Sequence, residues 1–207
     1  SNNVMKIKLH INDLPDNIIF KNSVAIDTET MGLRHSRDRL CLIQLSSGNN
    51  ICHLIKIENI EKKPKNLINI LKNKKILKIF HFARFDVCIL KYSYNINIDN
   101  IYCTKIASKL ARTYTDKHGY KDLCKELLNK NISKEEQTSD WGSKKLTLSQ
   151  QKYAATDVLY LHKIKEELDK ILIREKRIKL AEACFNFIKF RTDLDILGWS
   201  EEDIFKH

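Results

Sequence analysis

Four acidic side chains and one tyrosine are the residues of this sequence that can carry chemistry. They are Asp27, Glu29, Asp86, Tyr153 and Asp157. Asp27 and Glu29 end an apolar run with the character of a strand, and residues two apart on a strand project to the same face. Two carboxylates held together repel each other unless a cation lies between them, and hard oxygen ligands suit Mg²⁺ or Mn²⁺. A solvated strand edge is the weaker alternative, because charge beside a fully apolar run is costly without a partner.

The other two acids fall in segments with helical patterns. Asp86 follows a short strand and lies in a mostly apolar helix, where an ion pair with nearby Arg84 is an open alternative. Tyr153 and Asp157 are four positions apart and are therefore neighbours on one helix face. A phenol and an acid on an apolar face indicate a polar site that points inward.

Taken in order, these motifs resemble the DEDD superfamily of 3′–5′ exonucleases. Asp27-x-Glu29, Asp86 and Tyr153-x-x-x-Asp157 are similar to the three motifs of its tyrosine-containing subgroup, which includes RNase D. Residues 137–157 resemble the RNase D signature in detail.

The resemblance covers nearly the whole chain and extends to a smaller group. Residues 37–41, 103–116 and 195–200 are similar to the short alphaproteobacterial RNase D-like enzymes called nano-RNase C. The family resemblance implies an α/β protein with the RNase H-like exonuclease fold, a mixed central sheet flanked by helices.

The activity that the resemblance implies is metal-dependent phosphodiester hydrolysis. The expected enzyme is a 3′–5′ exoribonuclease that uses two divalent ions, Mg²⁺ or Mn²⁺, to cut short RNA, especially dinucleotides, to nucleoside 5′-monophosphates. Asp27 would bridge both ions, Glu29 and Asp157 would complete one site, Asp86 would act at the second, and Tyr153 would orient the attacking water. Two alternatives stay open: a broader exonuclease for longer RNA or DNA, and a non-catalytic nucleic-acid binding protein.

Substrate contacts are expected around these motifs. The candidates are Thr28, Leu33, His81, Phe82, Phe85, Arg112, Tyr114 and Trp141. Relatives place an apolar wedge between the last two bases at the position of Leu33, although a packed loop leucine is the alternative. Aromatic side chains can stack on bases, but they can equally belong to the core.

The basic polar run 112–118 offers donors for a terminal phosphate. If Arg112 closes the far end of the site, the enzyme would prefer substrates as short as a dinucleotide. The alternative is a solvated loop between helices.

Composition limits the class of protein and the partners. A net charge of +11 favours a polyanionic partner, although a sequence dense in Lys, Asn and Ile can be basic without function. No apolar run approaches the roughly 20 residues of a membrane span, and no signal-peptide core is visible, so we expect a cytoplasmic protein without a membrane partner. The six cysteines lack zinc spacing and are expected to be buried, reduced thiols.

The 207 residues fit a single exonuclease domain, with a catalytic core over about 1–172 and a helical extension over about 173–207. Strands are expected at 6–10, 23–27, 40–45 and 51–55 as an antiparallel meander, with a further strand at 75–80. Helices are expected at 64–71, 84–94, 104–111, 121–128, 149–172 and 176–190. Ser149 is expected to cap the helix over 149–172.

The apolar tail around 185–199 indicates a homo-oligomer, by resemblance a ring-like octamer, unless the tail packs on its own core.

Overall fold

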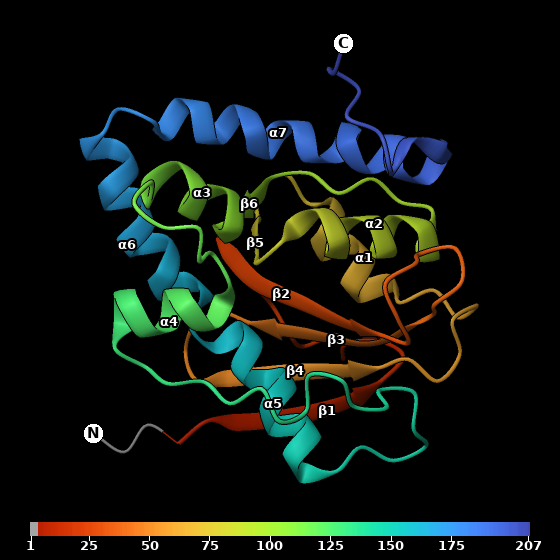
Figure 1. The fold of residues 1–207 in the computed structure, drawn as a ribbon. Helices are drawn as coiled ribbons and strands as arrows, with labels where there is room; N and C mark the ends of the chain where they lie inside the picture. Colours follow the sequence, from red (N-terminus) through yellow and green to blue (C-terminus); the bar gives the residue numbers. More distant parts are fainter. Residues whose placement is uncertain (1–3) are drawn as a thin grey trace.

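One mixed sheet organises the molecule (Figure 1). The computed structural model describes residues 4–207, and in this range six strands lie in the order β1–β4–β3–β2–β5–β6. They are β1 (Lys6–Ile11), β2 (Ser23–Thr30), β3 (Leu40–Ser46), β4 (Ile51–Lys56), β5 (Leu77–Phe80) and β6 (Ile101–Cys103). β2, β3 and β4 are antiparallel neighbours, and β5 and β6 extend the sheet from β2 in parallel. The expected mixed α/β sheet is confirmed.

The expected four-stranded antiparallel meander is right for β2, β3 and β4 but wrong for β1. β1 lies at the edge of the sheet and pairs with β4 in parallel. Alternation of side chains identifies a strand, but it carries no information about which strand will be its partner. β6 was not expected, because three residues are too few to show a period.

Seven α-helices occur within residues 4–207, and most match the expected segments. They are α1 (Lys65–Lys72), α2 (Ala83–Tyr94), α3 (Thr104–Ala111), α4 (Tyr120–Leu128), α5 (Leu148–Leu159), α6 (Leu161–Arg174) and α7 (Ile178–Leu194), and a π-helical turn, η1 (Asp195–Trp199), follows. The helix expected over 149–172 is divided in two at Tyr160, whose backbone leaves the helical conformation.

The cap expected at Ser149 is also wrong. Thr147 caps α5, because its hydroxyl accepts from the Gln150 backbone N–H while the Gln150 side chain accepts from the Thr147 backbone N–H.

The helices pack on the sheet so that two of them reach the end of β2. α5 crosses β2, β3 and β4, while α2 contacts β3, β5 and β6. α7 lies along α2 and α3 at the top of Figure 1. Five of the six cysteines are buried and all are free, as expected. Within the described residues, none of the helices combines the length and apolarity needed to cross a membrane.

Candidate active site

The first two acids lie where β2 leaves the core. Val24, Ala25 and Ile26 are fully buried, and Asp27 and Glu29 follow on one face of the same strand. The pairing with β3 shifts register directly after Glu29. Irregularities of this kind bend a strand and re-aim its side chains. The end of β2 is therefore shaped to present two carboxylates together.

A buried glutamine supports these two acids from the neighbouring strand. Gln44 lies opposite Asp27 in the β2–β3 pair and is 0% exposed. Its amide Nε2 lies 3.2 Å from Asp27 Oδ2, 3.5 Å from Glu29 Oε1 and 3.2 Å from the Ala154 carbonyl oxygen. Three surrounding acceptors require the nitrogen to face them. The sequence analysis missed this residue, although a glutamine inside an apolar strand is a recognisable signal of a buried polar contact.

Asp157 joins Asp27 and Glu29 from α5. One carboxylate oxygen of each of the three residues lies within 4.8 Å of the others. Within the described residues, none of the ion pairs involves these acids or Asp86. A cluster of hard oxygen donors without a side-chain cation fits divalent metal ions of the Mg²⁺ or Mn²⁺ type.

The proton affinities of the acids show how strongly the cluster needs a positive charge. Burial raises the pKa of Asp27 to about 6. Burial and the charges of its acidic neighbours raise the pKa of Glu29 to about 10. Burial, followed by repulsion from Asp27, also raises the pKa values of Asp86 and Asp157. Without a cation the acids therefore bind protons more readily than isolated carboxyl groups do, and a divalent ion would favour their ionised form.

Asp86 completes the group of four from the first turn of α2. It is 2% exposed, and its Oδ1 accepts a hydrogen bond from the Thr28 hydroxyl on β2. The alternative of an ion pair with Arg84 is wrong, because Arg84 pairs with Asp195 instead. Thr28 is itself buried, so its structural position is that of a support for Asp86.

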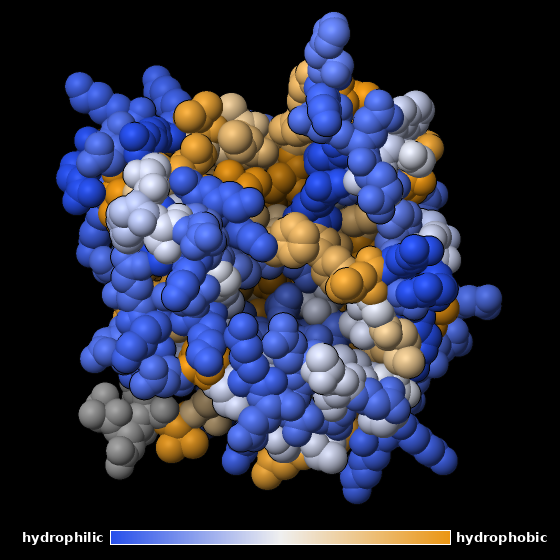
Figure 2. All heavy atoms as spheres, viewed as in Figure 1, coloured by the Kyte–Doolittle hydropathy of each residue, from blue (hydrophilic) through white to orange (hydrophobic). Residues whose placement is uncertain are grey.

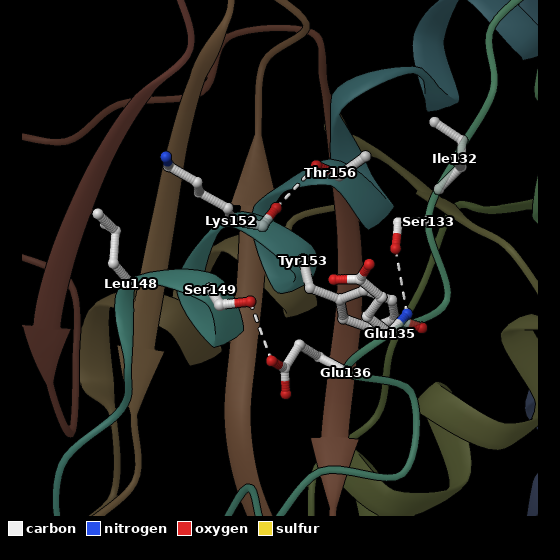
Figure 3. Close-up of a pocket in the computed structure, with 9 residues that line it drawn as sticks. All are labelled: Ile132, Ser133, Glu135, Glu136, Leu148, Ser149, Lys152, Tyr153 and Thr156. Atoms are coloured by element: carbon white, nitrogen blue, oxygen red, sulfur yellow. Dashed lines mark hydrogen bonds between the residues drawn. The ribbon is translucent and has the colours of Figure 1, made fainter.

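Tyr153 stands one turn before Asp157 on α5, turned toward the loop that carries Ser133 and Glu135 (Figure 3). Burial, with the negative charge of Asp157, raises the pKa of its phenol, so the hydroxyl keeps its proton at neutral pH. The Trp141 ring stacks beside it with a centroid distance of 6.0 Å. Trp141 is only 3% exposed, so the structure supports the packing alternative for this residue and not a base-stacking surface.

A cavity of about 260 Å³ opens above the acids. Asp27, Tyr153 and Asp157 line one part of it, and three lysines, Lys105, Lys121 and Lys134, line another. The lysines were not among the expected site residues, because surface lysines are abundant in this chain and only the fold shows which of them face the acids. Acids that can hold metal and amines that can bind phosphate thus share one cavity.

His81 and Phe82 join the same cavity from the turn between β5 and α2. Burial lowers the pKa of His81 to about 3, so its imidazole is neutral, and its Nδ1 lies 2.9 Å from the Thr104 hydroxyl. Phe82 adopts a left-handed backbone conformation with φ 62° and is 45% exposed. Such a conformation is rare for a bulky residue and is concentrated at functional sites.

A second, smaller cavity adjoins the first. Its volume is about 140 Å³, and its lining includes Phe82, Phe85 and Leu33. Leu33 is 85% exposed, so the packed-loop alternative for this residue is wrong. In the middle of the face drawn in Figure 2, hydrophobic side chains lie beside a hollow that hydrophilic side chains surround.

The expected phosphate contact of Arg112 is not what the structure shows. Arg112 is 2% exposed, and its guanidinium binds Glu126, the Ser108 hydroxyl and the Lys117 carbonyl oxygen. Tyr114 is 69% exposed, but its hydroxyl also donates to Glu126. The donors of this run are used to hold the segment between α3 and α4, because a buried guanidinium needs internal acceptors.

Comparisons with known proteins show the family of this chain. The sequence pattern of a family described as 3′–5′ exonuclease matches residues 10–173. The chain is similar to a ribonuclease D of Acidiphilium cryptum, with 30% identity over 166 residues that make up 80% of this chain and 42% of that protein. It spans about two fifths of the length of the curated ribonuclease D relatives it matches.

Solved structures give a match over nearly the full chain. NrnC of Brucella melitensis bound to pGG is 51% identical, with a TM-score of 0.94 and coverage of 98% of this chain and 99% of that one. The same Brucella protein with bound Mg²⁺ is 50% identical, with a TM-score of 0.93 and coverage of 98% and 100%.

Proposed function

Because this chain belongs to the 3′–5′ exonuclease family, we propose that it is a divalent-metal-dependent exoribonuclease that hydrolyses short RNA, especially dinucleotides, to nucleoside 5′-monophosphates. The observation that carries the proposal is the cluster of Asp27, Glu29 and Asp157 oxygens within 4.8 Å, with buried Asp86 beside it. A binding protein would have no need to keep four desolvated carboxylates together, because their repulsion is a cost without a bound cation.

The roles of the residues follow from where they lie. Asp27, Glu29, Asp86 and Asp157 would hold two divalent ions, which would supply an activated water and stabilise charge on the leaving 3′ oxygen. By the family resemblance, Asp27 would be the carboxylate that both ions share. Gln44 and Thr28 hold two of the carboxylates by hydrogen bonds.

Tyr153 would position the attacking water. Its raised pKa keeps the phenol protonated at neutral pH, so it can accept and donate hydrogen bonds but is a poor base. Its stacking against Trp141 holds the ring in one orientation. A ring held in one orientation can keep the attacking water in line for the reaction, which is how positioning lowers a reaction barrier.

The linings of the two cavities support short RNA as the substrate. The two cavities, about 260 and 140 Å³, meet at Phe82. Lysines in the larger cavity suit the backbone phosphates of a short RNA, and apolar residues in the smaller one suit a base. Brucella NrnC, the similar protein described above, was solved with pGG bound.

The test is hydrolysis of 5′-labelled RNAs from the dinucleotide to the decanucleotide with Mg²⁺, Mn²⁺ or EDTA, with Asp27→Ala as the control. Fast loss of the dinucleotide and slow loss of longer RNAs would support the proposal. Even trimming of all lengths, or of DNA, would replace it with a general 3′–5′ exonuclease. Absence of metal-dependent cleavage at every length would favour the binding-protein alternative.

We also propose that the protein is a homo-oligomer, by resemblance a ring-like octamer. Hydrophobic side chains gather over α7 at the top of Figure 2. Leu180, Phe190, Leu197 and Trp199 are each more than 40% exposed, which is unusual for so many large apolar residues in one segment. Light scattering would measure the subunit number.

The free, buried cysteines suit a reducing compartment, and we propose the cytoplasm.

A further inference from the structure

The C-terminal segment reaches the active-site region from outside the matched exonuclease domain. The family match ends at residue 173, whereas Asp195 and Ser200 both line the 140 Å³ cavity beside Phe82. Gly198 makes this approach possible, because its φ of 117° turns the chain back in a conformation that side chains rarely adopt. A segment added after the nuclease domain thus forms part of a cavity next to the catalytic acids.

Arg84 joins this segment to the catalytic helix α2. Its Nε lies 2.9 Å from Asp195 Oδ2 and its Nη2 lies 2.8 Å from Oδ1, so the pair is bidentate. Nη2 also donates to the Ser200 carbonyl oxygen at 2.9 Å. Asp195 is 6% exposed, while the Arg84 side chain is 42% exposed and lines the cavity. A bidentate pair fixes the plane of a guanidinium, which a single contact would leave free to rotate.

Most of the remaining cavity lining is apolar or aromatic, and it also includes His35 and Gly32. Leu33, Phe82, Phe85 and Ile89 line it, and Phe82 also lines the cavity with the acids. Bases that are not stacked in a helix bind to proteins between aromatic rings, apolar side chains and the planes of arginine guanidinium groups. The volume, about 140 Å³, is below the 300 Å³ or so typical of drug-sized ligands, so a single base is the fitting occupant.

We propose that the C-terminal turn, residues 195–200, forms one wall of a nucleobase pocket, and that Asp195 holds the Arg84 guanidinium as a surface on which one base of the substrate stacks. The inference rests on the proposed function, because it assumes that the substrate is a short RNA. Asp195 is a positioning residue in this arrangement, since it acts through Arg84 and not on the reacting atoms.

The test compares Asp195→Asn with Asp193→Asn. Asp193 pairs with Lys91 and lies outside the cavity lining, so its variant loses an ion pair between α7 and α2 without changing the pocket. Kinetics are measured on the RNA dinucleotide pApA and on a base-free ester, the same dinucleotide with a hydrogen atom in place of each base. We expect Asp195→Asn to raise KM for pApA about tenfold with little change in kcat, and to leave hydrolysis of the base-free ester unchanged. Asp193→Asn should leave both substrates unaffected.

Two further measurements keep the result decisive. If Asp195→Asn does not fold, Arg84→Lys keeps the positive charge but removes the planar surface, and it should give the same selective rise in KM. Equilibrium binding of pApA and of its two analogues that each lack one base tests the pocket without turnover, and loss of one base should weaken binding about tenfold in the wild type but not in Asp195→Asn.

If Asp195→Asn lowers kcat/KM equally for pApA and for the base-free ester, or for neither, the proposed role of Asp195 is wrong. Equal affinity of the wild type for pApA and for both analogues would show that no base is bound here. Failure of the proposed function gives a different pattern: the wild type would not cleave pApA, while the binding series would still report on the pocket.

Discussion

Replacing Gln44 with leucine separates support of the metal site from stability of the fold. The glutamine is fully buried, and its one amide nitrogen contacts Asp27, Glu29 and the Ala154 carbonyl oxygen. Its Oε1 is buried and has no hydrogen-bond partner within the described residues. Leucine has a similar size, removes the donors and also removes this unpaired oxygen.

The two effects on stability oppose each other. The lost hydrogen bond to Asp27 contributes about 1.5–3 kcal/mol if that acid is ionised, and the bond to the Ala154 carbonyl about 1 kcal/mol. Removing the unpaired Oε1 recovers about 1–3 kcal/mol. The free energy of unfolding should therefore change by between a gain of about 0.5 and a fall of about 3 kcal/mol, with a fall of about 1 kcal/mol at the middle of these ranges. Metal affinity should fall about 10–100-fold, because Gln44 orients two ligands at once.

The assay is a Mg²⁺ titration followed by calorimetry, together with urea unfolding in EDTA. Ile43→Val is the matched control, since this fully buried neighbour on β3 points to the other face. It should lower stability by about 1 kcal/mol and leave metal affinity unchanged. A loss of several kcal/mol in Gln44→Leu with unchanged Mg²⁺ affinity would refute the reasoning and make Gln44 a packing residue.

Three further predictions concern the same molecule. Tyr153→Phe should lower kcat about 100-fold while Mg²⁺ affinity stays the same, and a parallel loss of both would contradict a positioning role. In EDTA, Tm should fall as pH rises from about 4. The pKa values of Asp27 and Glu29 in the folded state, about 6 and about 10, lie above their ordinary values, so the folded state binds more protons than the unfolded state in this range. Mg²⁺ should reverse this trend, so that the rise in Tm on adding Mg²⁺ becomes larger as pH increases. A Tm that changes with neither pH nor Mg²⁺ would argue against a shared metal site. Arg112→Ala should lower the free energy of unfolding by about 2–3 kcal/mol, since Arg112 is buried but its partner Glu126 is part-exposed. It should slow the cleavage of RNA with and without a 5′-phosphate equally. A loss of activity confined to the 5′-phosphorylated RNA would support the phosphate contact instead.

Much of the catalytic site is readable from the sequence because its determinants are local. Asp27 and Glu29 share a face because a strand alternates, and Tyr153 and Asp157 share one because a helix repeats every 3.6 residues. The apolar runs around them also predict the strands and helices that carry them. Local periodicity therefore placed each pair of candidate residues on one face, and the family resemblance supplied their expected catalytic roles and the mixed sheet.

Contacts between distant segments were decided only by the tertiary structure. Periodicity does not say that β1 pairs with β4 in parallel, that Gln44 faces two acids, or that Arg112 is buried against Glu126. It also does not bring Asp195 to Arg84 across 111 positions of chain. Such contacts depend on strand order and helix packing, which bring together groups whose sequence separation carries no periodic signal. Sequence by itself thus determined which groups can do the chemistry, and the fold decided which side chains support them and which ones can reach a substrate.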